Sequence, residues 1–335
     1  MAGSSRSPRA GKGLSLSKVD AKKNIFIASP RGFCAGVSYA IDIVNLVLEQ
    51  HGPPVYVRHE IVHNRHVVED LRKRGARFVD DLAEVPEGAL LVFSAHGVSP
   101  AVRSEAESRG LDIVDATCPL VTKVHLEAQR FAELGYDILL IGHRGHVEVE
   151  GTLGQAPEFM QLVETVDDVA QVSVRDPAKV AIVTQTTLSV DDTRNIVAAV
   201  RRRFPDVLTP DKDDICYATQ NRQQAVKSLA EDCDLILVIG SPTSSNANRL
   251  VEVARGAGTQ ARLIEAASDI EASWLEGLDS VGVTAGASTP EGLVEEVIER
   301  MGTLFRAGAT EMKTEPERVT FALPKGLRKA DGDAA

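Results

Sequence analysis

The sequence has no apolar run that approaches the roughly 20 residues needed to cross a bilayer. Its first 18 residues also lack the apolar core of a secretory signal. Basic residues are in short supply, because 37 Lys and Arg stand against 48 Asp and Glu and leave a net charge of −11. Nucleic acids are bound by clustered Lys and Arg, so this balance argues against a nucleic-acid partner. We therefore expect a cytoplasmic protein that binds neither nucleic acid nor membrane.

Cysteine is scarce, with four residues in 335 and no C-x-x-C pair among them. Disulfides are rare in the reducing cytosol, where cysteine is more often buried, catalytic or metal-binding. The sequence also has no G-x-G-x-x-G segment after an apolar strand, which is the usual fingerprint of a bound NAD or flavin. A disulfide framework is therefore the weaker interpretation, and any electrons have to come from outside the chain.

The sequence does contain a regular alternation of apolar runs and helical patterns. With 43% hydrophobic residues, the chain can bury a substantial core in two or three domains. Short β-branched runs that are apolar on both faces predict parallel strands covered by helices. We predict strands at 24–28, 89–95, 111–116, 136–142, 179–185, 234–240, 261–266 and 280–286. We predict helices at 37–48, 65–74, 119–134, 191–203, 220–230, 246–255 and 291–301. The fold class is α/β.

Three of the cysteines follow a weak repeat along the chain. Cys34, Cys118 and Cys216 are 84 and 98 residues apart, and each precedes a helical pattern. This spacing predicts three similar α/β lobes with mainly parallel sheets, each contributing one cysteine to a common centre. The expected division is a disordered tail at 1–23, lobes at 24–118, 119–215 and 216–310, and a C-terminal tail at 311–335.

The three cysteines lie in loops just before predicted helices, where the helix dipole and free N–H groups favour a thiolate. Any one of them taken alone is as easily a small buried hydrophobe, which is how we interpret Cys233. Three widely spaced thiolates suit zinc as well as an iron–sulfur cluster. A [4Fe-4S] cluster with three cysteine ligands leaves one iron open to a substrate oxygen. The residues by themselves do not decide between these metals.

Small polar loops follow several of the predicted strands, at the edge where ligands bind in open α/β sheets. They lie at 94–97, 142–146, 184–187, 240–246 and 285–289. Ser244, Ser245 and Asn246 precede a predicted helix, so they could bind phosphate oxygens or form a simple N-cap through Ser245 or Asn246. In isolation we favour the cap, and Ser288 has the same ambiguity.

Five segments together identify a family. They are Gly32-Phe33-Cys34-Ala35-Gly36, Asp115-Ala116-Thr117-Cys118-Pro119, Gly142-His143-Arg144-Gly145-His146, Thr184-Gln185-Thr186-Thr187-Leu188-Ser189 and Cys216-Tyr217-Ala218-Thr219. In this order and at these spacings, from about residue 25 to about residue 306, the sequence resembles the 4-hydroxy-3-methylbut-2-enyl diphosphate reductase family.

The resemblance implies a trefoil of three lobes around one central [4Fe-4S] cluster per chain, held by Cys34, Cys118 and Cys216. It implies reductive removal of the hydroxyl group from an allylic diphosphate, which yields isopentenyl and dimethylallyl diphosphate in the last step of the non-mevalonate pathway. The two electrons would come from an external donor such as ferredoxin or flavodoxin.

The resemblance also assigns roles to individual residues. The diphosphate-binding positions of the family correspond to His63, His96, His146, Ser244, Ser245, Asn246 and Ser288. Glu148 corresponds to the proton donor, and a carboxyl group beside a buried anion has a raised pKa, which suits that role. Thr186 corresponds to a residue that positions the substrate hydroxyl. Val147 departs from the family, which commonly has proline there, and this puts the rigidity of the loop in doubt.

Two other functions compete with this one. A zinc-dependent hydrolase of a phosphorylated substrate would use the same three cysteines around zinc. A redox sensor would use a labile cluster as a signal, although the sequence lacks the basic face expected of a DNA-binding regulator.

Overall fold

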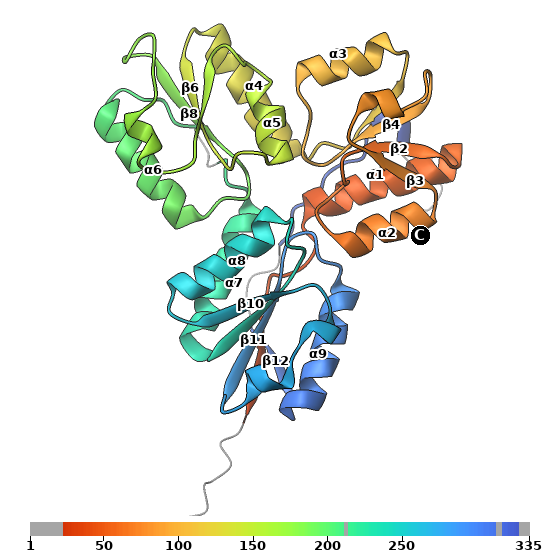
Figure 1. Cartoon of the computed structure of the whole chain (residues 1–335), viewed down its shortest axis with the longest axis vertical. Coiled ribbons are helices and arrows are strands. Elements are labelled where there is room, and N and C mark those ends of the chain that lie inside the picture. Colours follow the sequence, from red (N-terminus) through yellow and green to blue (C-terminus); the bar gives the residue numbers. More distant parts are fainter. Residues whose placement is uncertain (1–22, 211–213, 313–316, 328–335) are drawn as a thin grey trace, which may run out of the picture.

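The computed structural model describes residues 23–210, 214–312 and 317–327. In this part of the chain, all the strands pair in parallel and form three separate sheets. Each sheet and its helices make one lobe, and the three lobes meet in the middle in the manner of a trefoil (Figure 1). The predicted α/β class and the three parallel lobes are confirmed. The predicted tail at 1–23 lies outside the described residues apart from Lys23.

Lobe 1 has a four-stranded sheet between helices. Its strands, in sheet order, are β3 (Ala76–Val79), β2 (Val55–Arg58), β4 (Leu90–Phe93) and β5 (Asp112–Asp115). Its helices are α1 (Ala35–His51), α2 (Arg65–Lys73) and α3 (Pro100–Ser108). Side chains alternate between the two faces of a strand, so Val57 and Val92 pack with α1 and α2 while Leu91 and Phe93 pack on the α3 side.

Lobe 2 has the smallest of the three sheets, with three strands. Its strands, in sheet order, are β7 (Met160–Val163), β6 (Asp137–Ile141) and β8 (Val180–Thr184). Its helices are α4 (Pro119–Glu133), α5 (Val147–Leu153) and α6 (Val190–Arg203). Ile138 and Leu140 pack against α4 and α5, whereas Leu139 and Ile141 pack against α6. Both faces of the sheet are therefore covered, which is why β6 is apolar throughout.

Lobe 3 has a five-stranded sheet. Its strands, in sheet order, are β10 (Gln260–Ile264), β9 (Leu235–Ile239), β11 (Ser280–Ala285), β1 (Asn24–Ile27) and β12 (Ala309–Glu311). Its helices are α7 (Tyr217–Asp232), α8 (Ser245–Gly256) and α9 (Glu291–Phe305). Ile236 and Val238 pack with α7 and α8, and Leu237 packs with α9. Cys233 is buried in the same core, as predicted.

The ends of the chain depart from the predicted division into lobes. The strand β1 was placed at the start of lobe 1, but it pairs with β11 and β12 in the sheet of lobe 3. After β12, the described segment 317–327 packs Leu323 and Leu327 against the α1 core of lobe 1. The chain therefore links lobes 1 and 3 twice, once near each end.

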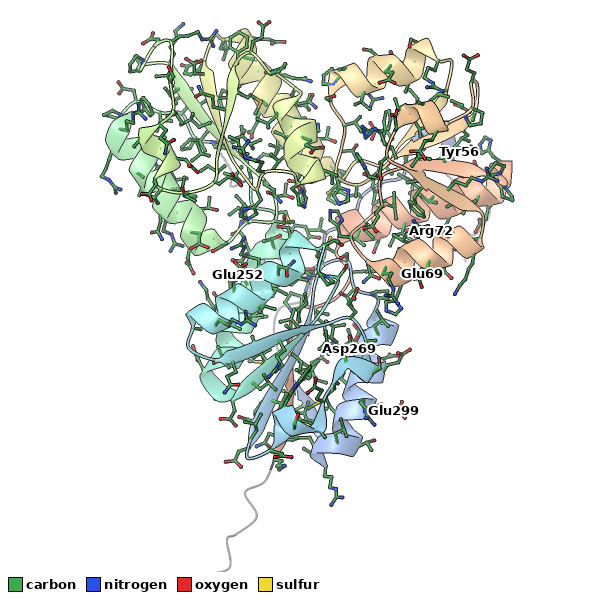
Figure 2. The ribbon with its side chains drawn as sticks, in the orientation of Figure 1. Tyr56, Glu69, Arg72, Glu252, Asp269 and Glu299 are labelled. Carbon is green, nitrogen blue, oxygen red and sulfur yellow. The ribbon has the colours of Figure 1, made fainter. Side chains whose placement is uncertain are left out.

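The charged side chains lie mainly on the outer surface, as Glu252 on α8 and Glu299 on α9 illustrate (Figure 2). The predicted helices and strands are all present. Several short elements were not predicted, namely α3, α5, β2, β3, β7 and β12. None of the described helices is long and apolar enough to span a membrane.

Candidate active site

One cavity at the centre of the trefoil is lined by loops from all three lobes. The residues that line it follow the carboxyl ends of β1, β2, β4, β8, β9 and β11, or begin helices α4, α5 and α7. Cys34, Cys118, Cys216, His63, His96, His146, Glu148, Thr186, Ser244, Ser245, Asn246 and Ser288 all line this cavity. The structure thus brings together every residue that the sequence predicted for the site.

Each of the three cysteines is the N-cap residue of a helix. Cys34 begins α1, Cys118 begins α4 and Cys216 begins α7. The Cys216 sulfur accepts a hydrogen bond from the Thr219 N–H at 3.4 Å and lies 3.2 Å from the Thr219 hydroxyl. The positive ends of three helix dipoles therefore point at one place, where they favour negative charge on the sulfur atoms.

Gly36 allows two of these sulfur atoms to approach each other. A Cβ atom at this position would lie 2.5 Å from the Cys118 sulfur and 3.9 Å from the Cys34 sulfur. Both thiols are thus gathered around a point that any larger residue would fill. The sequence alone gave no reason to single out Gly36, because the clash is with a cysteine 82 positions away.

The raised pKa values of Cys118 and Cys216 argue against a role as free nucleophiles. Burial is the main cause that raises the pKa of Cys118 to about 12 and that of Cys216 to about 11. Neighbouring thiolates add to both shifts. Such thiols keep their protons at neutral pH unless a metal ion displaces them, as metal ligation does.

Three cysteines that line one cavity are a donor set that an iron–sulfur cluster can use. Within the described ranges, no group of three or more His, Cys, Asp or Glu side chains is close enough to hold one metal ion. Thiolates on zinc would each lie about 2.3 Å from the same atom. Thiolates on a [4Fe-4S] cluster bind different irons and therefore stand farther apart. The residues present fit such a cluster.

Three histidines form the wall contributed by lobes 1 and 2. The ring of His63 lies 4.2 Å from that of His96 and 5.2 Å from that of His146, centroid to centroid. The His63 Nε2 atom is buried without a hydrogen-bond partner among the described residues. This nitrogen lines the cavity and is available to a polar group placed there.

The electrostatics of this wall indicate what kind of group it can bind. Burial and the neighbouring histidines lower the pKa of His96 well below its usual range and that of His146 to about 3. No Lys or Arg is among the described residues that line the cavity. An anion placed between these rings would stabilise the protonated form of His96 and accept from the N–H groups of the wall, which therefore suits a phosphate group.

Lobe 3 contributes the start of α8 and the loop after β11 to the lining of the cavity. Ser244, not Ser245 or Asn246, is the N-cap of α8 and accepts a hydrogen bond from the Ala247 N–H. Asn246 accepts one from the Ala287 N–H at 2.9 Å, which ties the two loops together. The predicted cap by Ser245 or Asn246 is therefore wrong by one or two positions.

Ser288 makes a contact between lobes rather than a helix cap. Its hydroxyl donates a hydrogen bond to the main-chain carbonyl of His63 at 3.0 Å. The helix α9 begins instead after Pro290, which offers no capping side chain. Ser288 thus holds the His63 loop of lobe 1 against lobe 3.

Glu148 and Thr186 form a buried pair on the lobe 2 side of the cavity. The Thr186 N–H donates to Glu148 Oε1 at 2.6 Å, and the Thr186 hydroxyl donates to Oε2 at 3.0 Å. Burial raises the pKa of Glu148 to about 7, although both hydrogen bonds favour the carboxylate. The Thr186 carbonyl in turn accepts from the Cys216 N–H at 3.1 Å, so this pair adjoins a cysteine loop.

Val147 lies at the first position of helix α5 rather than in a loop. The side chain of His146 caps this helix, because its Nδ1 atom accepts a hydrogen bond from the Glu148 N–H at 3.1 Å. Proline is favoured at the first position of a helix because no hydrogen bond is lost there. Valine keeps the same helical start, so the orientation of Glu148 does not depend on proline.

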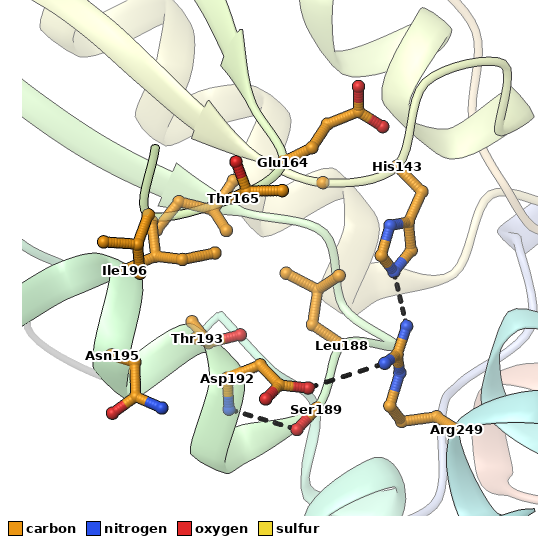
Figure 3. Close-up of a pocket in the computed structure, with 13 residues that line it drawn as sticks. His143, Glu164, Thr165, Leu188, Ser189, Asp192, Thr193, Asn195, Ile196 and Arg249 are labelled. Carbon is orange, nitrogen blue, oxygen red and sulfur yellow. Dashed lines mark hydrogen bonds and ion pairs between the residues drawn. The ribbon is translucent and has the colours of Figure 1, made fainter. Parts of the chain in front are cut away.

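A second pocket, with a volume of about 290 Å³, opens between lobes 2 and 3 (Figure 3). Arg249 from α8 reaches across it to His143, whose Nε2 atom lies 2.7 Å away, and it also pairs with Asp192. None of the cysteines or predicted site residues lines this pocket. This second pocket is therefore separate from the predicted site residues.

Comparison with known proteins identifies the family to which the chain belongs. The family model described as LytB protein matches residues 25–302. The chain belongs to the LytB family. Curated relatives named 4-hydroxy-3-methylbut-2-enyl diphosphate reductase include one from Bordetella pertussis, 60% identical over 92% of this chain and 95% of that protein. One from Mycobacterium ulcerans is 56% identical over 96% and 97% of the two chains.

Solved structures agree with the LytB assignment. The structure of the E-1-hydroxy-2-methyl-but-2-enyl-4-diphosphate reductase from Plasmodium falciparum superposes with a TM-score of 0.89 at 40% identity, covering 91% of this chain and 97% of that one. Another, described as the terminal enzyme of the non-mevalonate pathway, gives 0.60 at 32% identity over 84% and 99%. LytB relatives give no support to the zinc-hydrolase alternative.

Proposed function

We propose that this LytB-family enzyme reduces (E)-4-hydroxy-3-methylbut-2-enyl diphosphate to isopentenyl and dimethylallyl diphosphate, the last step of the non-mevalonate pathway. The observation that carries the proposal is one cavity that combines three helix-capping cysteines, three histidines and a protonatable carboxyl. The names of the relatives describe the same reaction. The net reaction consumes two electrons and two protons and releases the hydroxyl oxygen as water.

Cys34, Cys118 and Cys216 would hold one [4Fe-4S] cluster. When bound, the cluster would supply the electrons and, at the iron without a cysteine ligand, a Lewis acid for the substrate hydroxyl. Because the sequence has no dinucleotide fingerprint, we expect ferredoxin or flavodoxin to deliver the electrons in the cytoplasm.

The diphosphate would lie between the histidine wall and the start of α8. His63, His96 and His146 would donate hydrogen bonds to its oxygens, and Ser245 and Asn246 would face it from a helix N-terminus. His146 has a fixed tautomer in this arrangement. Its Nδ1 atom accepts from the Glu148 N–H, so the remaining ring proton is on Nε2, which is the donor available to a ligand.

Glu148 would supply the proton that leaves with the hydroxyl group. With a pKa raised to about 7, much of this carboxyl is protonated at neutral pH, and a nearby diphosphate raises the pKa further. Thr186 would position the substrate hydroxyl, because its own hydroxyl is held by Glu148 at 3.0 Å. Both side chains are buried, so bulk water does not compete for the proton.

Anaerobic analysis tests the proposal directly. The purified protein should be brown and contain about four irons with matching inorganic sulfide per chain, and it should convert the substrate when a reductant is supplied. The Cys118→Ser variant should lose the cluster. The Cys233→Ala variant should retain it, because Cys233 is buried in the core of lobe 3. Absence of inorganic sulfide from anaerobically prepared protein would refute the proposal.

A further inference from the structure

Arg222, in the middle of α7, is the largest side chain that the described part of the chain buries completely, with 0% of its surface exposed. A buried guanidinium is costly unless every one of its charges and donors is paired. It does not line the central cavity, so it does not act on a bound ligand. Its burial therefore needs another explanation.

The hydrogen bonds of Arg222 connect the loop before Cys34 to the first turn of its own helix α7, which Cys216 caps. Its Nε and Nη2 atoms donate to the carbonyl of Gly32 at 3.2 and 2.7 Å, two residues before Cys34. Its Nη1 atom donates to the carbonyl of Ala218 at 3.0 Å, two residues after Cys216. One planar group thus spans segments that are distant in sequence but adjacent at the centre.

The charge of Arg222 is balanced from a third segment. Glu317, 15% exposed, accepts from Nη1 at 3.1 Å and from the Asn221 amide at 2.9 Å. Its segment, residues 317–327, is anchored on α1 by the Phe321 ring, which packs edge-on against Tyr39. The described end of the chain therefore acts as a strap that brings a counter-ion to the cysteine loops.

We infer that Arg222 is a positioning residue that sets the separation of Cys34 and Cys216, with Glu317 as its counter-ion. This inference rests on the proposed [4Fe-4S] cluster. A rigid cluster binds well only where its thiolates are already held apart at the right spacing, and groups behind the ligands provide that order. Arginine suits the role because its donors are spread over three nitrogens in a rigid plane, whereas the donors of lysine all radiate from one nitrogen.

Cluster retention, rather than activity, tests the inference. The variants are Arg222→Met, Arg222→Lys and Glu317→Gln, with Arg194→Met as the control because Arg194 forms an exposed ion pair with Asp191 on α6. Each holoprotein is reconstituted anaerobically and analysed for iron and sulfide. The loss of visible absorbance in an iron chelator gives the release rate, and electron paramagnetic resonance of the reduced protein reports the ligand geometry.

Arg222→Met should release its cluster at least about tenfold faster than wild type, which is the usual size of the effect of removing a group behind a metal ligand. Arg222→Lys should fall between the two, and Glu317→Gln should accelerate release less than Arg222→Met. The resonance spectrum should change in both Arg222 variants. Arg194→Met should match wild type in every measurement.

The outcomes separate the inference from the proposed function. A wild-type protein that binds no cluster would overturn both. A wild-type cluster that Arg222→Met and Arg222→Lys release at the wild-type rate, with an unchanged spectrum, would overturn the inference alone. If circular dichroism shows that Arg222→Met does not fold, the release rates of Arg222→Lys and Glu317→Gln test the inference instead. Wild-type release rates in both variants would overturn it.

Discussion

Replacing Glu148 by glutamine should make the protein more stable at high pH and less active. The side chain of Glu148 is 4% exposed, and burial raises its pKa from 4.5 to about 7. Glutamine has the same shape, cannot ionise, and can keep both contacts with Thr186. Its carbonyl can accept from the Thr186 N–H, and its amide can donate to the Thr186 hydroxyl.

The sign of the effect follows from the protons bound in each state. Between pH 4.5 and about 7, the folded protein keeps a proton on Glu148 that the unfolded chain has already released. Raising the pH through this window therefore favours the unfolded state, and the loss of stability is complete above the folded pKa. At about 1.4 kcal/mol for each pKa unit, the carboxylate costs the folded state about 3 kcal/mol at pH 8.5.

Anaerobic denaturant unfolding of wild type and variant at pH 5 and pH 8.5 measures this difference. The two free energies of unfolding should agree within about 1 kcal/mol at pH 5, and the glutamine variant should be about 3 kcal/mol more stable at pH 8.5. The difference between wild type and variant at each pH cancels the other titrating groups, and comparing the two pH values removes any effect of the substitution that does not depend on pH. Glu150→Gln, an exposed position on the same helix, should give no such gain.

Turnover should change in the opposite direction. Glu148→Gln should bind substrate with little change but lose about 10² to 10⁴ in kcat, because it has no proton to donate. The kcat of wild type should fall as the pH rises above the pKa of Glu148. A variant with no gain in stability at pH 8.5 would show that burial does not raise the pKa of the Glu148 carboxyl. A fully active variant would refute the role of Glu148 as proton donor.

Three further predictions concern other parts of the molecule. Gly36→Ala should lower the iron content while the far-ultraviolet circular dichroism stays unchanged, because its Cβ would lie 2.5 Å from the Cys118 sulfur; full iron occupancy would contradict this. Binding of inorganic diphosphate should take up protons, because an anion raises the lowered pKa of His96, and its affinity should increase as the pH falls. Calorimetry in two buffers of different ionisation enthalpy measures the uptake, and identical heats would count against the histidine wall as the diphosphate site. Leu140→Ala, at a fully buried position in lobe 2, should lower the free energy of unfolding by about 2–5 kcal/mol, and a loss below 1 kcal/mol in urea unfolding would show that the core collapses around the gap.

Long, strongly patterned elements were predictable from the sequence, and short ones were not. The strands β6, β8 and β9 are apolar at nearly every position because helices cover both faces, and that pattern is local. The helix α5 spans only seven residues and contains two glutamates and a glycine, so its pattern is too short to recognise. Its presence matters because it orients Glu148.

The sequence by itself determined the three α/β units, the helix-preceding cysteines and the polar loops at strand ends, because each depends on neighbouring residues. Only the tertiary structure decided how these parts combine. In the folded chain, β1 lies in the sheet of lobe 3 and Ser244 caps α8. Arg222 is buried with its side chain bonded to the loop before Cys34. These features depend on contacts between residues far apart in the chain, where packing and burial, rather than local preference, set the position of each group.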